Sequence, residues 1–208
     1  MPRSRIKICG ITRAEDARLA AELGADAIGL NFYARSKRAL EPGQVEEIVS
    51  DLPAFVTVVG LFVDPSREEV AAVLESGLIH CLQFHGAESA NYCRSFGIPF
   101  IKAVRVKSLA ECRQTLQPFY GTCSVILDAY VPGVAGGTGE TFDWSVAREL
   151  VNDDQNPIIL AGGLHPDNVA DAITAVKPYG VDISSGVESA PGVKDPELLR
   201  RFFAAVNG

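Results

Sequence analysis

The sequence lacks the segments that carry a protein into or across a membrane. Its longest apolar run, residues 54–63, is far shorter than the roughly 20 residues that a transmembrane helix needs. No charged segment followed by an apolar one precedes Ile6, so we expect no secretory leader. We therefore expect a cytoplasmic protein that makes no membrane contact.

Basic stripes and metal-ligand spacings are also missing. The chain has 19 Lys and Arg against 26 Asp and Glu, a net charge of −7, which argues against nucleic acid as a partner. Its five cysteines are odd in number and contain no Cys-x-x-Cys pair, so neither a disulfide framework nor a zinc ribbon is indicated. The three histidines show no metal-ligand spacing with carboxylates. These observations predict a small-molecule partner, with no metal ion.

Short β-rich runs alternate with amphipathic helical stretches eight times along the 208 residues, with no linker between them. This pattern predicts an α/β protein with one domain over residues 1–208. A doubly wound open sheet shares the alternation, but eight units that end in a helix favour a single closed (β/α)₈ barrel. No Gly-x-Gly-x-x-Gly follows the first predicted strand, which argues against a dinucleotide-binding sheet. The predicted strands are residues 6–9, 27–31, 56–62, 81–84, 100–104, 124–128, 158–161 and 181–184, and the predicted helices include residues 14–23, 42–50, 66–75, 166–176 and 196–206.

The tetrapeptide Lys7-Ile8-Cys9-Gly10 places a thiol at the end of the first predicted strand. Side chains alternate along a strand, so Lys7 and Cys9 share one face. Gly10 permits a sharp turn, which predicts an accessible sulfur. A free cysteine is more often a small buried apolar residue. The polar residues at the other strand ends favour a reactive role for Cys9 instead.

In a barrel of this class the C-terminal ends of the strands surround the active site. Here those ends are unusually polar or rich in glycine. The glycines after the seventh and eighth strands let main-chain amides approach an anion closely, which predicts a phosphate site. The candidates at the strand ends are Cys9, Asn31, Gln83, His85, Asp128, Gly162, Gly163, Ser184, Ser185 and Gly186.

The first and last strands become neighbours when the barrel closes. Lys7 and Asp182 both point into the barrel by the alternation of side chains, so we expect an ion pair beneath the site. Asp182 is also a candidate for substrate binding. A purely structural core pair is the more common use of such a contact, and favouring the Cys9 thiolate would be an additional effect of the ammonium. We expect cationic groups and strand-end dipoles to lower the pKa of the Cys9 thiol.

Seven motifs occur in order along the whole chain: Lys7-Ile8-Cys9-Gly10-Ile11-Thr12-Arg13, Ser36-Lys37-Arg38, Gln83-Phe84-His85-Gly86, Leu127-Asp128, Gly136-Gly137-Thr138-Gly139 with Phe142-Asp143-Trp144, Ala161-Gly162-Gly163-Leu164, and Asp182-Ile183-Ser184-Ser185-Gly186-Val187-Glu188. Together they resemble the motifs of the phosphoribosylanthranilate isomerase family. Two departures are Phe84, where leucine is more usual, and Glu140, where a basic residue is common.

The resemblance implies an Amadori rearrangement of tryptophan biosynthesis, which needs no cofactor. The substrate is N-(5-phosphoribosyl)anthranilate and the product is 1-(2-carboxyphenylamino)-1-deoxyribulose 5-phosphate. The resemblance also implies that Cys9 is the general base, that Asp128 is the general acid and that Arg38 binds the anthranilate carboxylate. A planar carboxylate suits a guanidinium better than an ammonium, which favours Arg38 over Lys37. Either a monomer or a homodimer is compatible with the sequence.

Two alternative functions stay open on the sequence. Indole-glycerol-phosphate synthase and the histidine-pathway isomerase bind related ribulose phosphates in such barrels, but the first uses lysine and glutamate and the second uses paired aspartates. A non-catalytic barrel that only binds a phosphorylated ligand would be expected to have lost Cys9 or Asp128. Both residues are present, so an isomerase is the expected function.

Overall fold

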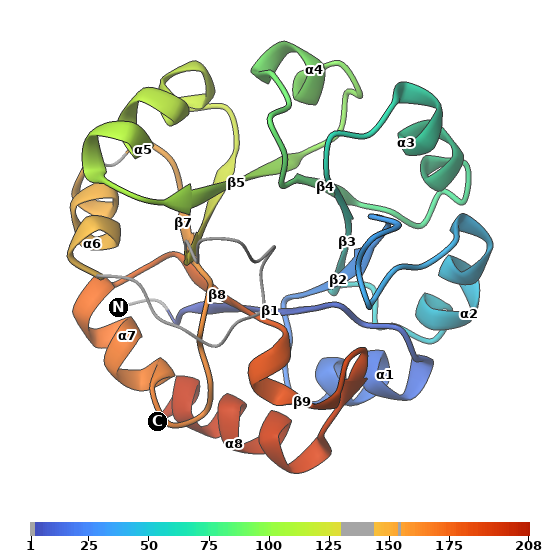
Figure 1. The fold of residues 1–208 in the computed structure, drawn as a ribbon. Helices are drawn as coiled ribbons and strands as arrows, with labels where there is room; N and C mark the ends of the chain where they lie inside the picture. The colour runs from blue at the N-terminus through green and yellow to red at the C-terminus, as the bar shows by residue number, and fades with distance from the viewer. Residues whose placement is uncertain (1–2, 130–143, 154) are drawn as a thin grey trace.

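The structure is a computed structural model that describes residues 3–129, 144–153 and 155–208. Eight parallel strands close into a barrel, with the helices arranged around its outside (Figure 1). Each strand pairs with its neighbour in the sequence, and β8 pairs with β1 to complete the ring. The closed (β/α)₈ barrel predicted from the sequence is therefore confirmed, and the open sheet is excluded. The strands are β1 (Arg5–Cys9), β2 (Ala27–Asn31), β3 (Thr57–Phe62), β4 (Cys81–Phe84), β5 (Phe100–Val106), β6 (Ser124–Ala129), β7 (Ile158–Leu160) and β8 (Gly180–Ile183).

Several helices begin at a side-chain cap. Ser66 and Glu69 form a reciprocal capping box at the start of α3, and Asp195 accepts hydrogen bonds from two amides in the first turn of α8. The helix expected over residues 166–176 begins only at Val169, because Asn168 binds the main chain of His165 and holds a turn there. The helices are α1 (Ala14–Glu22), α2 (Val45–Val49), α3 (Arg67–Leu74), α4 (Ala90–Arg94), α5 (Leu109–Leu116), α6 (Trp144–Asn152), α7 (Val169–Val176) and α8 (Pro196–Asn207), with 3₁₀ turns η1 (Pro42–Gln44), η2 (Gln117–Phe119) and η3 (Ser185–Val187).

A short antiparallel hairpin follows β8 and was not predicted from the sequence. It consists of β9 (Glu188–Ala190) and β10 (Val193–Lys194), and it lies beside β1 and α1 in Figure 1. Its strands are only three and two residues long, which is too short for a periodic signal. The predicted motif at residues 136–139, together with Glu140 and residues 142–143, lies outside the described residues.

The barrel has a large outer core between sheet and helices and a small inner core. Alternate strand residues point inward, and the same alternation places Lys7, Cys9, Gln83, Asp128 and Asp182 on the inner side. The polar candidates therefore share the barrel interior with a few apolar side chains. The buried apolar residues of the inner core are Val59, Cys81, Ile101, Ala103, Ile126, Ile159 and Ala161.

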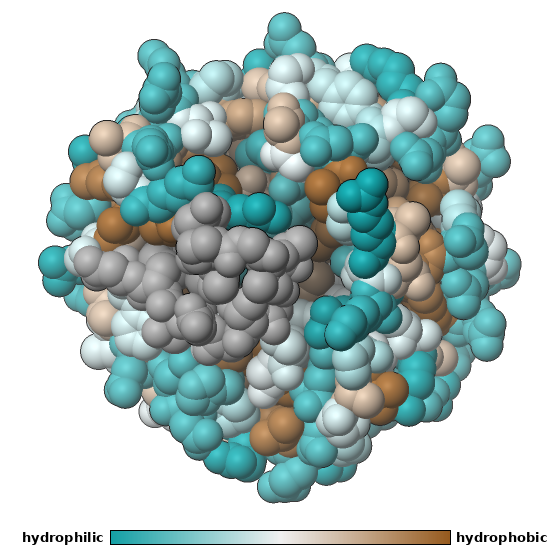
Figure 2. Space-filling model, in the orientation of Figure 1, coloured by the Kyte–Doolittle hydropathy of each residue, from teal (hydrophilic) through white to brown (hydrophobic). Residues whose placement is uncertain are grey.

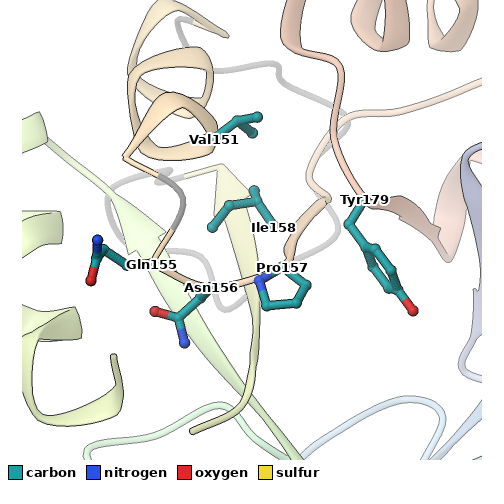
Figure 3. A pocket seen from close by; sticks show the side chains of 6 residues that line it. All are labelled: Val151, Gln155, Asn156, Pro157, Ile158 and Tyr179. Carbon is teal, nitrogen blue, oxygen red and sulfur yellow. The ribbon is translucent and has the colours of Figure 1, made fainter. Parts of the chain in front are cut away.

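Two cavities open at the N-terminal end of the barrel, opposite the mouth that carries the strand-end candidates. One of about 290 Å³ is lined by side chains from the end of α6, from the start of β7 and from Tyr179 (Figure 3). A larger one, of about 620 Å³, opens at the same end and reaches up to Lys7. In barrels of this class that end contributes stability, whereas chemistry takes place at the C-terminal end.

The surface seen in the orientation of Figure 1 is largely hydrophilic, with small apolar groups between the polar side chains (Figure 2). Among the described residues, no helix is both long and apolar enough to cross a bilayer.

Phe84 is at the centre of an aromatic cluster beneath α4. Its side chain is completely buried, and its ring centroid lies between 5.8 and 6.4 Å from those of four other rings. Such pairs add stability beyond the area that they bury. The cluster consists of Phe84 with Phe62, Tyr92, Phe96 and Phe100.

We predict that Phe84→Ala lowers the free energy of unfolding by about 3–5 kcal/mol, because it removes a buried ring and leaves a cavity. Phe55→Ala is the matched control, since Phe55 is 98% exposed and its loss should change stability by less than about 0.5 kcal/mol. Urea unfolding followed by circular dichroism measures both values. Equal effects of the two substitutions would contradict the packing role of Phe84.

Candidate active site

Cys9 ends β1 beside an ion pair in the barrel interior. The Lys7 Nζ lies 2.8 Å from Asp182 Oδ1, and both side chains are buried, so the predicted ion pair is confirmed. A Cβ added to Gly29 on β2 would lie 3.0 Å from both the Cys9 Sγ and the Lys7 Nζ, so glycine makes room for this pair. Gly29 was missed in the sequence, where its signal was a glycine inside an apolar strand.

The thiol of Cys9 differs from the prediction in two respects. The residue is only 7% exposed, so the sulfur is not accessible as expected from the turn at Gly10. Burial raises the pKa of the Cys9 thiol, and the nearby Lys7 and Lys194 lower it by less. The expectation of a lowered pKa is therefore wrong for this structure, because removal of water outweighs the two cations.

Lys7 itself stays charged. Burial alone would lower the pKa of its ammonium, but Asp182 and Cys9 together outweigh that effect and raise it. The interior therefore keeps a fixed positive charge next to the sulfur. Any negative charge that forms on Cys9 is stabilised by this ammonium.

Asp128 approaches the interior from the other side. Two strands, β8 and β7, separate its strand β6 from β1 along the ring. Its carboxylate Oδ2 lies 3.4 Å from His85 Nε2, at the end of β4. The sequence suggested both residues as site candidates but did not predict that they meet. Asp128 is 9% exposed, so the pair lies at the inner edge of the mouth.

The loop that carries His85 is held by a buried lysine. Lys102 Nζ donates hydrogen bonds to the carbonyl oxygens of Phe84 and Gly86 and to Glu88 Oε2, at 3.3, 2.6 and 2.9 Å. Glu88 in turn accepts the amide of Asp64 at 2.8 Å. This clamp was missed in the sequence, where a lysine in the middle of an apolar strand was its only signal.

Arg38 lies in the segment after β2, and its guanidinium binds Glu188 of the hairpin. Its Nε donates to Glu188 Oε1 at 2.7 Å, and its Nη2 donates to the other carboxylate oxygen. Glu188 contacts a second cation, Lys194, whose Nζ lies 2.8 Å from Oε1. Neither Glu188 nor Lys194 was predicted as a site residue, because the turns that bring them here are irregular.

Two further candidates have polar side chains near the mouth. Asn31 holds the segment before Arg38: its Nδ2 donates to Ser36 Oγ at 3.1 Å, and its Oδ1 accepts the amide of Tyr33 at 2.9 Å. Gln83 is only 1% exposed, and its Oε1 has no hydrogen-bond partner among the residues that the structure describes. An unsatisfied buried oxygen in the interior is a potential acceptor for a ligand.

The candidate phosphate residues come together at the ends of β7 and β8. Gly162 and Gly163 have φ values of 78° and 64°, which favour glycine. A Cβ added to Gly186 would lie 2.0 Å from the carbonyl oxygen of Leu164, so the two turns touch only because that residue is glycine. Together with Ser184 and Ser185, these three glycines are all partly exposed.

Comparisons with known proteins show which family the chain resembles over nearly its whole length. The family model described as N-(5'-phosphoribosyl)anthranilate (PRA) isomerase matches residues 6–205. The chain is 50% identical to N-(5'-phosphoribosyl)anthranilate isomerase of Acidithiobacillus ferrooxidans over 208 residues, all of both chains. It is 51% identical over 206 residues to the Pseudomonas putida protein of that name, covering 99% of this chain and 98% of the relative.

The chain belongs to the phosphoribosylanthranilate isomerase family. The crystal structure of phosphoribosyl anthranilate isomerase from Thermotoga maritima is similar over 99% of both chains, with a TM-score of 0.90 and 39% identity. Another structure, with a TM-score of 0.87 and 37% identity over 99% of both chains, is a complex with reduced 1-(o-carboxyphenylamino)-1-deoxyribulose 5-phosphate. The family resemblance inferred from the motifs is thus confirmed.

No group of three or more His, Cys, Asp or Glu side chains that could hold a metal ion is found in the described part of the chain. The polar groups of the candidate site are instead suited to proton transfer and anion binding. They comprise a thiol next to an ammonium, a carboxylate next to an imidazole, a guanidinium and a set of glycine turns.

We predict that alkylation of Cys9 becomes faster as pH rises through the alkaline range. Only the thiolate reacts with the alkylating reagent. Because burial raises the pKa of Cys9, the pH at which the alkylation rate is half-maximal should lie above about 8.5, the pKa of a free thiol. Lys7→Met removes the adjacent cation and should move the midpoint higher still, whereas Lys37→Met on the exposed loop should not. Iodoacetamide labelling at a series of pH values, resolved by peptide mass spectrometry, measures the alkylation rate of Cys9. A midpoint below about pH 8 would contradict a raised pKa.

Proposed function

We propose that the protein is a phosphoribosylanthranilate isomerase, which converts N-(5-phosphoribosyl)anthranilate into 1-(2-carboxyphenylamino)-1-deoxyribulose 5-phosphate in tryptophan biosynthesis. Family membership over nearly the whole chain carries this conclusion. The positions of Cys9 and Asp128 support it, because the two groups point into one barrel from strands on different sides of the ring. An acid and a base so placed can address one sugar from two directions.

In the proposed reaction, Asp128 donates a proton to the furanose ring oxygen and the ring opens to a protonated Schiff base. Cys9 then removes the C2 proton, and the resulting enolamine relaxes to the ketone. C2 is oxidised as C1 is reduced within the same molecule, so no electrons are exchanged with a second molecule and the rearrangement requires acid and base groups only. Cys9 can accept the C2 proton only as a thiolate. Because burial disfavours the thiolate, the Lys7 ammonium is important: it stabilises this form before the proton is taken up.

The two anionic ends of the substrate match two parts of the mouth. We propose that Arg38 binds the anthranilate carboxylate. The phosphate of the substrate would bind the amides and hydroxyls of residues 162–163 and 184–186, which are partly exposed. The remaining candidates, Asn31, Gln83, His85 and Asp182, would contact the substrate or hold the residues that do. The unsatisfied Oε1 of Gln83 is the best supported acceptor among them.

We also propose one barrel domain over residues 1–208, a cytoplasmic location and a monomeric or homodimeric state. A phosphorylated substrate does not cross membranes freely, which favours an enzyme in the compartment where the substrate is made. One similar structure is described as monomers generated from a dimeric Thermotoga maritima isomerase, at 37% identity and a TM-score of 0.86 over 99% of both chains.

We expect the purified protein to consume N-(5-phosphoribosyl)anthranilate, as followed by the loss of its fluorescence. Cys9→Ser and Asp128→Asn should each lower kcat by roughly 10²–10⁴-fold or more, because each removes a proton-transfer group. Cys123→Ser, at a partly exposed cysteine near the opposite end of the barrel, is the control and should retain activity. Tight binding of the substrate by the unmodified protein without turnover would support a binding protein instead, and a fully active Cys9→Ser variant would refute the role of the base.

Arg38→Ala should raise KM more than it lowers kcat. Its contact is with a carboxylate remote from the reacting carbon, so it should be equally strong in the ground state and in the transition state. We expect a KM at least about tenfold higher, since hydrogen bonds between charged groups are worth about 1.5–3 kcal/mol. Lys37→Ala is the adjacent control. An unchanged KM with a lower kcat would place Arg38 in the chemical steps instead.

A further inference from the structure

Glu188 is a buried carboxylate between two cations at the barrel mouth, and the proposed chemistry does not use it. We propose that Glu188, held in place by Lys194, positions the guanidinium of Arg38 so that its outer edge is presented to the substrate carboxylate. Both would be positioning residues that determine specificity for a carboxylated aromatic amine. This inference rests on the proposed function, and it adds residues to which the sequence motifs assign no role.

The Arg38–Glu188 contact leaves part of the guanidinium available. A guanidinium has five N–H donors, and Glu188 accepts hydrogen bonds from two of them, one on Nε and one on Nη2. No described residue accepts a hydrogen bond from the outer edge, where parallel N–H groups on Nη1 and Nη2 form the second fork by which arginine binds carboxylates. The Arg38 side chain is 19% exposed, whereas that of Glu188 is 5% exposed. The free edge therefore belongs to the more accessible member of the pair.

Glu188 cannot easily turn away from Arg38. Lys194 Nζ donates to its Oε1 at 2.8 Å, and the amide of Gly192 donates to the same oxygen at 3.3 Å. Burial alone would raise the pKa of Glu188, but its hydrogen bonds and its attraction to Arg38 and Lys194 outweigh burial and lower it. The carboxylate is thus ionised at neutral pH and has a fixed orientation.

Lys194 links this carboxylate to the end of the strand that carries the base. Its ammonium is 0% exposed and donates to the carbonyl oxygens of Cys9 at 2.6 Å and Ser184 at 3.2 Å, as well as to Glu188. These contacts use its three donors, so Lys194 has none left for a ligand. Its own amide donates to Asp16 Oδ2 at 3.0 Å, which fixes the hairpin to α1.

The charges of the three groups suit an anionic ligand. Arg38 and Lys194 are cationic and Glu188 is anionic, so one positive charge is in excess at a partly closed site. Without Glu188, two cations would repel one another and Arg38 would be free to turn into solvent. With it, the excess charge is on the exposed edge of Arg38, where a planar carboxylate fits.

A competing role for Glu188 makes the opposite prediction. Glu188 could occupy the place of the substrate carboxylate and be displaced when substrate binds. Its removal would then make carboxylated ligands bind more tightly, since they would no longer compete with it. In the positioning role, its removal makes those ligands bind less tightly.

The test measures binding of two ligands by calorimetry. One is reduced 1-(o-carboxyphenylamino)-1-deoxyribulose 5-phosphate, and the other is the same compound without its carboxylate. The proteins are the unmodified chain, Glu188→Gln, Glu188→Asp, Lys194→Met and the control Asp153→Asn. Asp153 accepts the same side-on fork from Arg113, on the surface at the end of α6, so the control removes an equivalent carboxylate charge far from the site.

We expect Glu188→Gln to reduce the preference for the carboxylated ligand about tenfold, the effect of losing one charge-assisted contact. Its KM should rise while kcat stays within about threefold, because the contact is equally strong in both states. Lys194→Met should have the same direction of effect, Glu188→Asp should restore part of the preference, and Asp153→Asn should change nothing.

Two kinds of result would overturn the proposal. Tighter binding of the carboxylated ligand by Glu188→Gln would identify Glu188 as a competitor. Equal weakening of both ligands, or an unchanged preference, would make the glutamate a purely structural residue. Failure of the proposed function would look different, because the unmodified protein would then neither turn over N-(5-phosphoribosyl)anthranilate nor prefer the carboxylated ligand.

Discussion

Closure of the sheet between β1 and β8 is the constraint on which the candidate site depends. The pairing places Lys7 opposite Asp182 and brings the ends of both strands together, so that Cys9 lies near Ser184. Lys194 then binds the carbonyl oxygens of both residues from outside the sheet. A barrel has no free edge at this junction, so the proposed base Cys9, the ion pair and the turns of the phosphate candidates have a fixed spacing.

Buried lysines stabilise the mouth at two separate places. Lys194 binds two carbonyl oxygens and Glu188, and Lys102 likewise binds two carbonyl oxygens and Glu88. Each thus ties irregular backbone beyond a strand end to a buried carboxylate. Removing one partner of such a pair leaves an uncompensated charge at a cost of about 3–5 kcal/mol. These clamps hold the loops of Arg38 and His85, which carry candidate groups but have little regular structure of their own.

The barrel and its eight strands were predictable because the signals are local. Periods of alternating apolar residues, a serine or aspartate cap and a proline at a helix start depend only on neighbouring residues. Within one or two residues, these signals located every strand of the barrel. The Lys7–Asp182 pair was also predictable, because alternation and closure suffice to place both side chains inward. The β9–β10 hairpin and the partners of Lys102 and Lys194 were not, since each requires contacts between distant, irregular segments.

The sequence by itself determined the family, the order of the strands and which residue types stand at their ends. Only the tertiary structure decided the chemical state of those residues. Cys9 shows the difference: its position at a strand end follows from alternation, but the pKa of its thiol depends on how completely the surrounding strands exclude water, and this effect outweighs the cations that the sequence placed nearby. The orientation of Arg38 likewise depends on Glu188, which is 150 residues away along the chain. Desolvation and long-range pairing both depend on residues that are close in space but distant in sequence, so local sequence patterns do not predict them.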